Sequence, residues 1–236
     1  MLCKIAELIT EIPTADGLAV RCKDYLWENN ATPDIIVQKE CYRWDRFAPS
    51  IKPETIAYVE AASQFYRQLL RYNGLYLHSS AVVRDGRAYL FSGHSGVGKS
   101  THTRLWINTF GGDTRVINDD KPALRCMDGT WYAYGTPWCG KNHINLNEKA
   151  PLAGICFLKQ APHNRIRRMQ PDEALQKILG QTMYQLPEME QMDALLQHLE
   201  RLLSQIPVYE MENCPEPAAA QLSYETMLQG ALEAKL

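Results

Sequence analysis

The chain has 236 residues, 45% of them hydrophobic and 22% charged, and its formal net charge is −2. These values are typical of a globular protein with one core, and they exclude a broad attraction to nucleic acid or anionic lipid. The seven cysteines are odd in number and include no C-x-x-C pair, so neither a disulfide framework nor a zinc site is expected. The start is not signal-like and no long apolar run follows, so we expect a cytoplasmic protein with no membrane partner.

Residues 1–72 are predicted to form a small β-rich part that ends in a helix and packs on the core. Short apolar pieces at 17–21 and 34–38 alternate with Pro, Asn, Asp and Gly, a pattern typical of short strands. From Pro53 to Tyr72 the apolar residues recur every three to four positions. This spacing predicts an amphipathic helix that ends near residue 73.

Residues 73–236 are predicted to form the main, catalytic part. Two β-forming runs, 75–83 and 87–92, flank a turn with Asp85-Gly86 at its centre, which predicts a hairpin. Further strands are predicted at 115–118, 131–134, 154–158 and 208–211, and helices at 100–109, 171–179, 189–206 and 216–234. The mixture predicts an α/β fold.

A glycine loop follows the second strand of that hairpin. The pattern G-x-x-x-x-G-K-[ST] is met between an apolar strand and a helix, which is the context this phosphate-binding motif requires. Lys99 is expected to reach the β- and γ-phosphates of ATP, and the Ser100 hydroxyl to bind Mg²⁺. The alternative is a glycine-rich turn with a solvated lysine. The predicted binding residues are Gly93, His94, Ser95, Gly96, Val97, Gly98, Lys99, Ser100 and Thr101.

Two adjacent carboxylates come about twenty residues after Lys99, behind the predicted strand 115–118. If that strand is a parallel neighbour of the loop's strand, Asp119 and Asp120 are delivered toward the γ-phosphate. A kinase needs one carboxylate for the acceptor hydroxyl and another negative group to share the Mg²⁺. The alternative is a polar turn at the end of a strand.

His78, the glycine loop and the strand ending in Asp119-Asp120 together resemble the catalytic domain of HPr kinase/phosphorylase. The resemblance implies a phosphoenolpyruvate carboxykinase-like P-loop kinase core with a mixed sheet, and phosphorylation of serine in a protein or peptide. It further implies that Lys99 binds phosphate and Ser100 binds magnesium. Asp120 would be the general base, with Asp119 as its electrostatic partner and His78 as a helper near that base.

One segment departs from the family pattern. Where the family has a glutamate followed by isoleucine, arginine and glycine, residues 135–141 read GTPWCGK. This segment is either a second phosphate contact or a polar loop, and Trp138 within it is either packing or a stacking platform. The basic cluster Arg165, Arg167 and Arg168 is either a solvated strand edge or a contact to an acidic group. The reverse phosphorylase activity is left open.

The leading hypothesis is an ATP- and Mg²⁺-dependent kinase that acts on a hydroxyl of a protein or peptide substrate. The sequence leaves two alternatives open, a kinase for a small hydroxylated molecule and a nucleotide-dependent switch that transfers no phosphate. Nucleic acid is not expected as a partner, and a homo-oligomer is compatible with the sequence.

Overall fold

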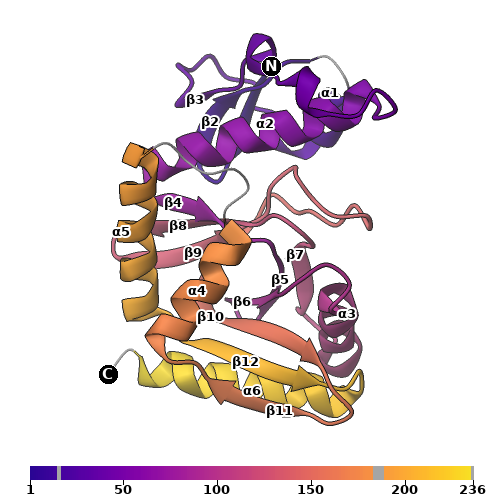
Figure 1. Cartoon of the computed structure of the whole chain (residues 1–236), viewed down its shortest axis with the longest axis vertical. Helices are drawn as coiled ribbons and strands as arrows, with labels where there is room; N and C mark the ends of the chain where they lie inside the picture. Colours follow the sequence, from indigo (N-terminus) through magenta and orange to yellow (C-terminus); the bar gives the residue numbers. More distant parts are fainter. Residues whose placement is uncertain (15–16, 183–188, 235–236) are drawn as a thin grey trace.

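The computed structural model describes residues 1–14, 17–182 and 189–234, so residues 183–188 and the last two residues of the predicted catalytic part lie outside it. The small sheet and helix α2 lie at one end of the molecule, and helix α6 lies at the other (Figure 1). Among the described residues, the strands form one three-stranded and one nine-stranded sheet. None of the described helices has the length and apolar run needed to cross a bilayer.

The N-terminal part contains a sheet in the order β1-β2-β3 and helix α2. The predicted helix from residue 53 is confirmed, because α2 continues into η4 and Asn73 then takes a φ of 54°. Residues 34–38 contain β3, but the strand predicted at 17–21 is wrong. Gly17, at a φ of 77°, starts the short helix α1 instead. The elements are β1 (Leu2–Ile5), β2 (Leu8–Glu11), α1 (Leu18–Arg21), η1 (Lys23–Tyr25), β3 (Ile35–Ile36), η2 (Lys39–Cys41), η3 (Trp44–Arg46), α2 (Pro53–Leu69) and η4 (Leu70–Tyr72).

The larger sheet is mixed and has the order β4-β8-β9-β10-β6-β5-β7, with β12 also on β10 and β11 on β12. Its long strand β10 runs antiparallel to β9 at its start and then parallel to β6 and β12. The strands are β4 (Gly74–Tyr76), β5 (Ser79–Arg84), β6 (Arg87–Ser92), β7 (Arg115–Asn118), β8 (Ala123–Met127), β9 (Thr130–Tyr134), β10 (Lys149–Gln160), β11 (Arg165–Arg168) and β12 (Val208–Asn213).

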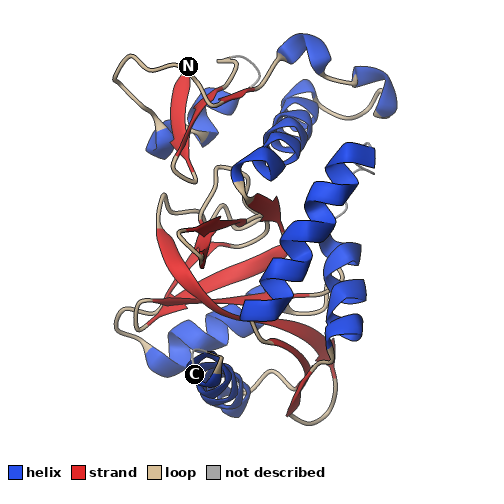
Figure 2. Cartoon of the chain, turned by 90° about the vertical axis from the view of Figure 1, so that its left-hand side faces the viewer, coloured by secondary structure: helices blue, strands red, loops and turns tan. Residues whose placement is uncertain are grey.

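Helices cover both faces of this sheet (Figure 2). They are α3 (Lys99–Phe110), α4 (Pro171–Thr182), α5 (Met189–Gln205) and α6 (Pro217–Glu233). Because side chains alternate along a strand, β6 contributes to two cores. Leu90 joins the cluster that includes Ile178 of α4 and Leu199 of α5. Tyr89 joins the cluster that includes Trp106 of α3 and residues of α6.

The strand predicted at 75–83 is two strands, β4 and β5, with a break at Leu77 and His78. At the break the backbone N–H of His78 donates to Gln181 O at 3.0 Å, and that of Ser79 donates to Asp120 O at 3.1 Å. The chain thereby changes partners, from β8 on one side of the break to β6 and β7 on the other. His78 therefore lies at a junction and not in a continuous strand.

The hairpin of β5 and β6 is confirmed, with Asp85 and Gly86 at φ values of 48° and 68°. Positive φ at both central residues is the mark of a type I′ turn. However, β7 is not the direct neighbour of β6 that we expected, because β5 lies between them and is antiparallel to both. The C-terminal ends of β6 and β7 still lie at the same end of the strands in the sheet, on either side of the start of β5.

The N-terminal part shares a buried cluster with the core. Phe65 and Tyr66 of α2 pack against Trp138, at ring-centroid distances of 4.8 Å and 5.5 Å. The Tyr66 hydroxyl also donates to the carbonyl oxygen of Lys121. The helix is thereby held against the segment that follows β7. The domain boundary at residue 72 stays a prediction.

Candidate functional site

The glycine loop joins the end of β6 to the start of α3. Gly93, Gly96 and Gly98 have φ values of 139°, 83° and 108°, which side-chained residues rarely adopt. Successive N–H groups in such a loop can converge on phosphate oxygens, and the N-terminus of α3 adds further N–H donors. The backbone is therefore shaped as the motif predicts, whereas phosphate binding stays a prediction.

Lys99 folds back over this loop. Its Nζ donates to Gly93 O at 3.0 Å and to His94 O at 3.4 Å. Burial lowers the pKa of Lys99, and the negative charge of Asp120 opposes that shift. The ammonium group is thus held at the loop by weak carbonyl contacts, which phosphate oxygens can replace with stronger charged ones.

His78 connects the glycine loop to Asp120. Its carbonyl oxygen accepts a hydrogen bond of 2.8 Å from the hydroxyl of Ser92, the residue before the loop. Its ring Nε2 lies 3.0 Å from Asp120 Oδ1. The other ring nitrogen, Nδ1, lies 3.0 Å from Gln181 Oε1 on α4. The imidazole is therefore fixed at both nitrogens and directs one of them at the predicted base.

The Asp120 carboxylate is held from both sides, since Lys121 Nζ bonds to Oδ2. Burial by itself raises the pKa of Asp120, but the hydrogen bond from His78 and the charge of Lys121 outweigh burial and lower it to about 2. The carboxylate is consequently ionised at neutral pH. Each oxygen keeps a further lone pair, so the group can still accept a hydrogen bond from a substrate hydroxyl.

Asn118 fixes the turn that carries both aspartates. Its Oδ1 accepts from the backbone N–H of Asp120 at 2.9 Å and of Lys121 at 2.6 Å. Its Nδ2 donates to Thr136 O at 3.1 Å. The turn is thereby tied to the segment 135–141, which the sequence did not link to the aspartates.

Asp119 is more enclosed than Asp120. The residue is 6% exposed, and its Oδ1 accepts a hydrogen bond of 2.5 Å from the Gly140 N–H. Burial raises the pKa of Asp119, the Gly140 N–H opposes this, and the charge of Asp120 adds to it. The pKa directions alone would make Asp119 the better proton acceptor, but its burial keeps a substrate hydroxyl away from its carboxylate. Exposure favours Asp120 for contact with a substrate.

The site has the donors that ATP and Mg²⁺ require. Mg²⁺ is usually bound through one or two carboxylates together with phosphate oxygens and water. Ser100 is exposed in the first turn of α3, and Asp119 adds a nearly buried carboxylate, one oxygen of which accepts from the Gly140 N–H. Among the described residues, no group of three or more His, Cys, Asp or Glu side chains could hold a metal alone. This set fits a metal that is shared with a nucleotide.

The remaining candidates, Trp138 and the arginine cluster, make contacts within the fold. Trp138 is 1% exposed and packs on α2, so it belongs to the core and not to a stacking platform. The arginine cluster lies on β11, which pairs with β12 at the edge of the sheet. Arg167 there forms ion pairs with Glu173 at 2.8 Å and Glu210 at 3.1 Å. This agrees with a solvated strand edge.

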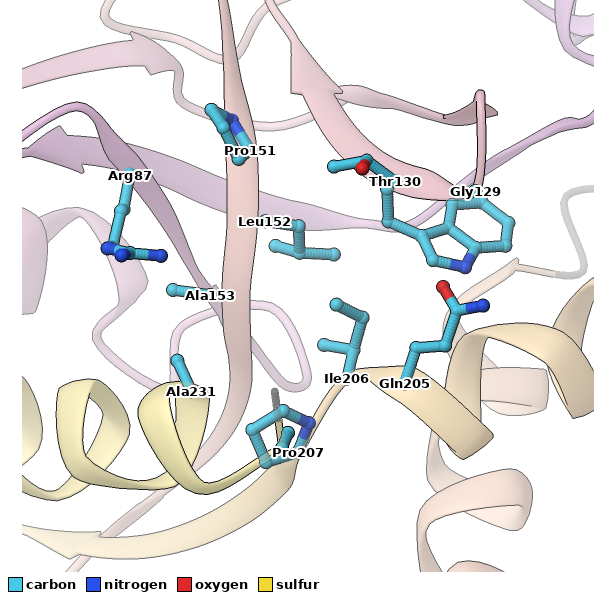
Figure 3. Close-up of a pocket in the computed structure, with 12 residues that line it drawn as sticks. Arg87, Gly129, Thr130, Pro151, Leu152, Ala153, Gln205, Ile206, Pro207 and Ala231 are labelled. Carbon is cyan, nitrogen blue, oxygen red and sulfur yellow. The ribbon is translucent and has the colours of Figure 1, made fainter. Parts of the chain in front are cut away.

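A pocket of about 250 Å³ lies away from the glycine loop. Figure 3 shows its lining, which includes Leu152, Ile206 and Pro207. Arg87, also in this lining, is the first residue of β6, whereas the glycine loop follows the last residue of that strand. The pocket therefore lies toward the opposite end of β6 from the predicted site.

Gln181, Lys121 and Asn118 contact the predicted site residues but were not predicted as site residues. Gln181 lies in a helix far along the chain, and no local pattern marks it as a partner of His78. Asn118 and Lys121 flank the aspartate pair, and an asparagine before Asp-Asp is a turn-forming signal that could have been used.

The model of the family described as SynChlorMet cassette protein ScmC matches residues 49–213. Among solved structures, the chain is similar to the Hpr(Ser) kinase/phosphatase from Coxiella burnetii. That similarity has a TM-score of 0.40 and 13% identity, over 68% of this chain and 92% of that chain. No curated protein matches the chain.

Proposed function

The chain belongs to the family of the SynChlorMet cassette protein ScmC, and we propose that it is an ATP- and Mg²⁺-dependent kinase for a protein or peptide serine. The observation that carries the proposal is the position of Asp120. Its negative charge affects the pKa of Lys99, so the carboxylate lies near that lysine. His78 fixes the carboxylate at 3.0 Å, and Asp120 also lines a pocket. A nucleotide-binding loop with no transfer activity has no need of such a carboxylate.

The residues have distinct parts in this proposal. The loop glycines and Lys99 would bind the phosphates, and Ser100 and Asp119 would hold the metal. Bound Mg²⁺ would neutralise negative charge on the phosphate oxygens. Asp120 accepts the hydrogen bond of the acceptor hydroxyl and orients its oxygen toward the γ-phosphorus. His78 fixes the direction of that carboxylate.

The transfer forms a bond from the acceptor oxygen to the γ-phosphorus and breaks the bond from that phosphorus to the leaving oxygen of ADP. The hydroxyl proton passes to Asp120 and then to water. With a pKa of about 2, Asp120 holds this proton only briefly. Phosphoryl transfer through a loose transition state depends mainly on positioning and electrostatics, so a weak base that is well oriented suffices.

The proposal is tested by incubating the purified protein with γ-labelled ATP and a cell lysate. Label on serine of a protein or peptide, lost in Lys99→Ala and Asp120→Asn, is the expected result. Label on a small metabolite would replace the acceptor class with a small hydroxylated molecule. Nucleotide binding without any transferred label would make the protein a nucleotide-dependent switch.

A further inference from the structure

A pocket of about 480 Å³ opens beside Asp120, between the N-terminal part and the segment after β9. Its volume lies within the range of about 300–1,000 Å³ that is usual for ligand pockets. One wall comes from the end of α1 and the first turns of α2, and the other comes from residues 139–143. The lining residues are Arg21, Glu54, Thr55, Tyr58, Asp120, Cys139, Gly140, Lys141 and His143.

Tyr58 joins the two walls. Its hydroxyl donates to Cys139 O at 2.6 Å, and the guanidinium carbon of Arg21 lies 4.4 Å from the centre of its ring. A guanidinium over an aromatic face is held in place while its N–H groups remain able to bind an anion. Arg21 is therefore presented to the pocket by the N-terminal part.

The pocket lies on the acceptor side of the site. Among the described residues that line it, none is predicted to bind nucleotide or metal. The predicted base Asp120, in contrast, does line the pocket. The glycine loop is connected to Asp120 by other residues, because the hydroxyl of Ser92, the residue before the loop, donates to the carbonyl oxygen of His78, and the His78 ring contacts Asp120. A molecule in the pocket can therefore contact Asp120 without occupying the phosphate loop.

The charges of the lining are unequally compensated. Asp120 is bonded to Lys121 and His78, whereas neither Arg21 nor Lys141 forms an ion pair with any residue that the structure describes. Glu54, in the first turn of α2, is the one other carboxylate in the lining, and its negative charge opposes those of Arg21 and Lys141. Two uncompensated cations against that one carboxylate favour a ligand that carries a negative group.

We propose that this pocket binds the acceptor, and that the acceptor is a peptide segment with a carboxylate side chain next to the serine. The proposal rests on the kinase function proposed above. The serine hydroxyl lies at Asp120, and the neighbouring carboxylate is bound by Arg21 and Lys141. A planar guanidinium can donate two parallel hydrogen bonds to a carboxylate, which gives direction as well as affinity. Arg21 belongs to the N-terminal part, which therefore contributes to the choice of acceptor in this proposal.

The test uses three labelled synthetic peptides of equal length, each with one serine flanked by aspartate, alanine or lysine. Binding to the full chain is measured by fluorescence anisotropy with a non-hydrolysable ATP analogue and Mg²⁺, and transfer is measured with ATP. The aspartate peptide should bind at least about tenfold more tightly than the alanine peptide, as charged hydrogen bonds predict. Arg21→Ala and Lys141→Ala should each reduce this preference. Lys23→Ala, an exposed cation outside the lining, should keep it.

Charge reversal at Arg21 distinguishes the loss of a pocket contact from misfolding of the variant. Arg21→Glu should reduce binding of the aspartate peptide and improve binding of the lysine peptide, which an unfolded protein would not do. Equal binding of all three peptides would overturn the proposal. So would a Lys141→Ala protein that loses affinity for the nucleotide analogue and keeps the peptide preference. Preferred binding of the aspartate peptide without transfer supports the pocket but contradicts the kinase function. Transfer of phosphate without preferred binding of the aspartate peptide supports the kinase function but contradicts the proposed role of the pocket.

Discussion

His78 Nε2 lies 3.0 Å from Asp120 Oδ1, although three strands, the glycine loop and a helix separate the two residues in the chain. The contact exists because His78 occupies the break between β4 and β5, beside the end of β7. The backbone bond from Ser79 N–H to Asp120 O at 3.1 Å fixes the same junction. The imidazole is thus placed by the sheet, and Asp120 is oriented by the imidazole.

We predict that His78→Ala lowers phosphoryl transfer by about one to three orders of magnitude, because Asp120 loses the group that orients it. The His78 side chain is 27% exposed, so the fold should tolerate the change. His163→Ala is the matched control, since His163 forms a similar pair with Glu212 at 2.8 Å on the surface. Full activity in His78→Ala, or unfolding of that variant, would reduce His78 to a structural residue.

Asp120→Asn and Asp119→Asn should fail in different ways. Asp120→Asn keeps the size and hydrogen-bonding reach of the side chain, so nucleotide should still bind while transfer falls by about 10² to 10⁴-fold. Asp119→Asn should raise the Mg²⁺ concentration needed for half-maximal activity, because an amide oxygen is a poorer ligand for a hard cation. A magnesium titration of activity distinguishes the two. Wild-type transfer by Asp120→Asn would show that the base lies elsewhere.

Lys99→Ala should abolish tight binding of ATP and Mg²⁺ and leave the fold intact. In the folded chain the Lys99 ammonium contacts two loop carbonyls and can exchange them for phosphate oxygens. The control is Arg104→Ala, which removes an exposed cation from the same helix. Isothermal titration with a non-hydrolysable ATP analogue measures both variants. Unchanged affinity in Lys99→Ala would contradict the phosphate-loop assignment.

His102 should make stability depend on pH. It is buried in α3, with Nδ1 2.9 Å from Asn213 Oδ1 and Nε2 3.0 Å from Ser223 Oγ. Burial lowers the pKa of His102 from 6.5 to about 4. The unfolded chain therefore takes up the proton first, and stability present above pH 6.5 is lost as the pH falls toward 4. The slope contributed by His102 approaches roughly 1.4 kcal/mol per pH unit.

The measurement is the free energy of unfolding from denaturant curves at several pH values between 7.5 and 4.5. His102→Gln should be less stable at neutral pH and should lose the part of the slope that His102 contributes. His163→Ala, an exposed histidine, serves as the control for removing a titratable ring. An unchanged slope in His102→Gln would show that protonation of this ring does not govern acid stability.

The sequence determined those features whose conformation depends on adjacent residues. The glycine spacing required positive φ at Gly93, Gly96 and Gly98, and the spacing of apolar residues determined α2. The Asp85-Gly86 pair determined the hairpin of β5 and β6. The same signal at Asp128-Gly129, with φ values of 48° and 81°, joins β8 to β9 and would have revealed the unpredicted strand β8.

Only the tertiary structure decided which distant residues meet. The break at His78 depends on hydrogen bonds to Gln181 and Asp120, and the apolar run there does not mark it. The presence of Arg21 and Asp120 in the lining of one pocket depends on how α1 and α2 pack against residues 139–143. Local propensity and periodicity act over a few residues of chain, whereas strand pairing and pocket walls arise from contacts between segments far apart in sequence. The binding loop was therefore predictable from the sequence, and the surroundings of its predicted base were not.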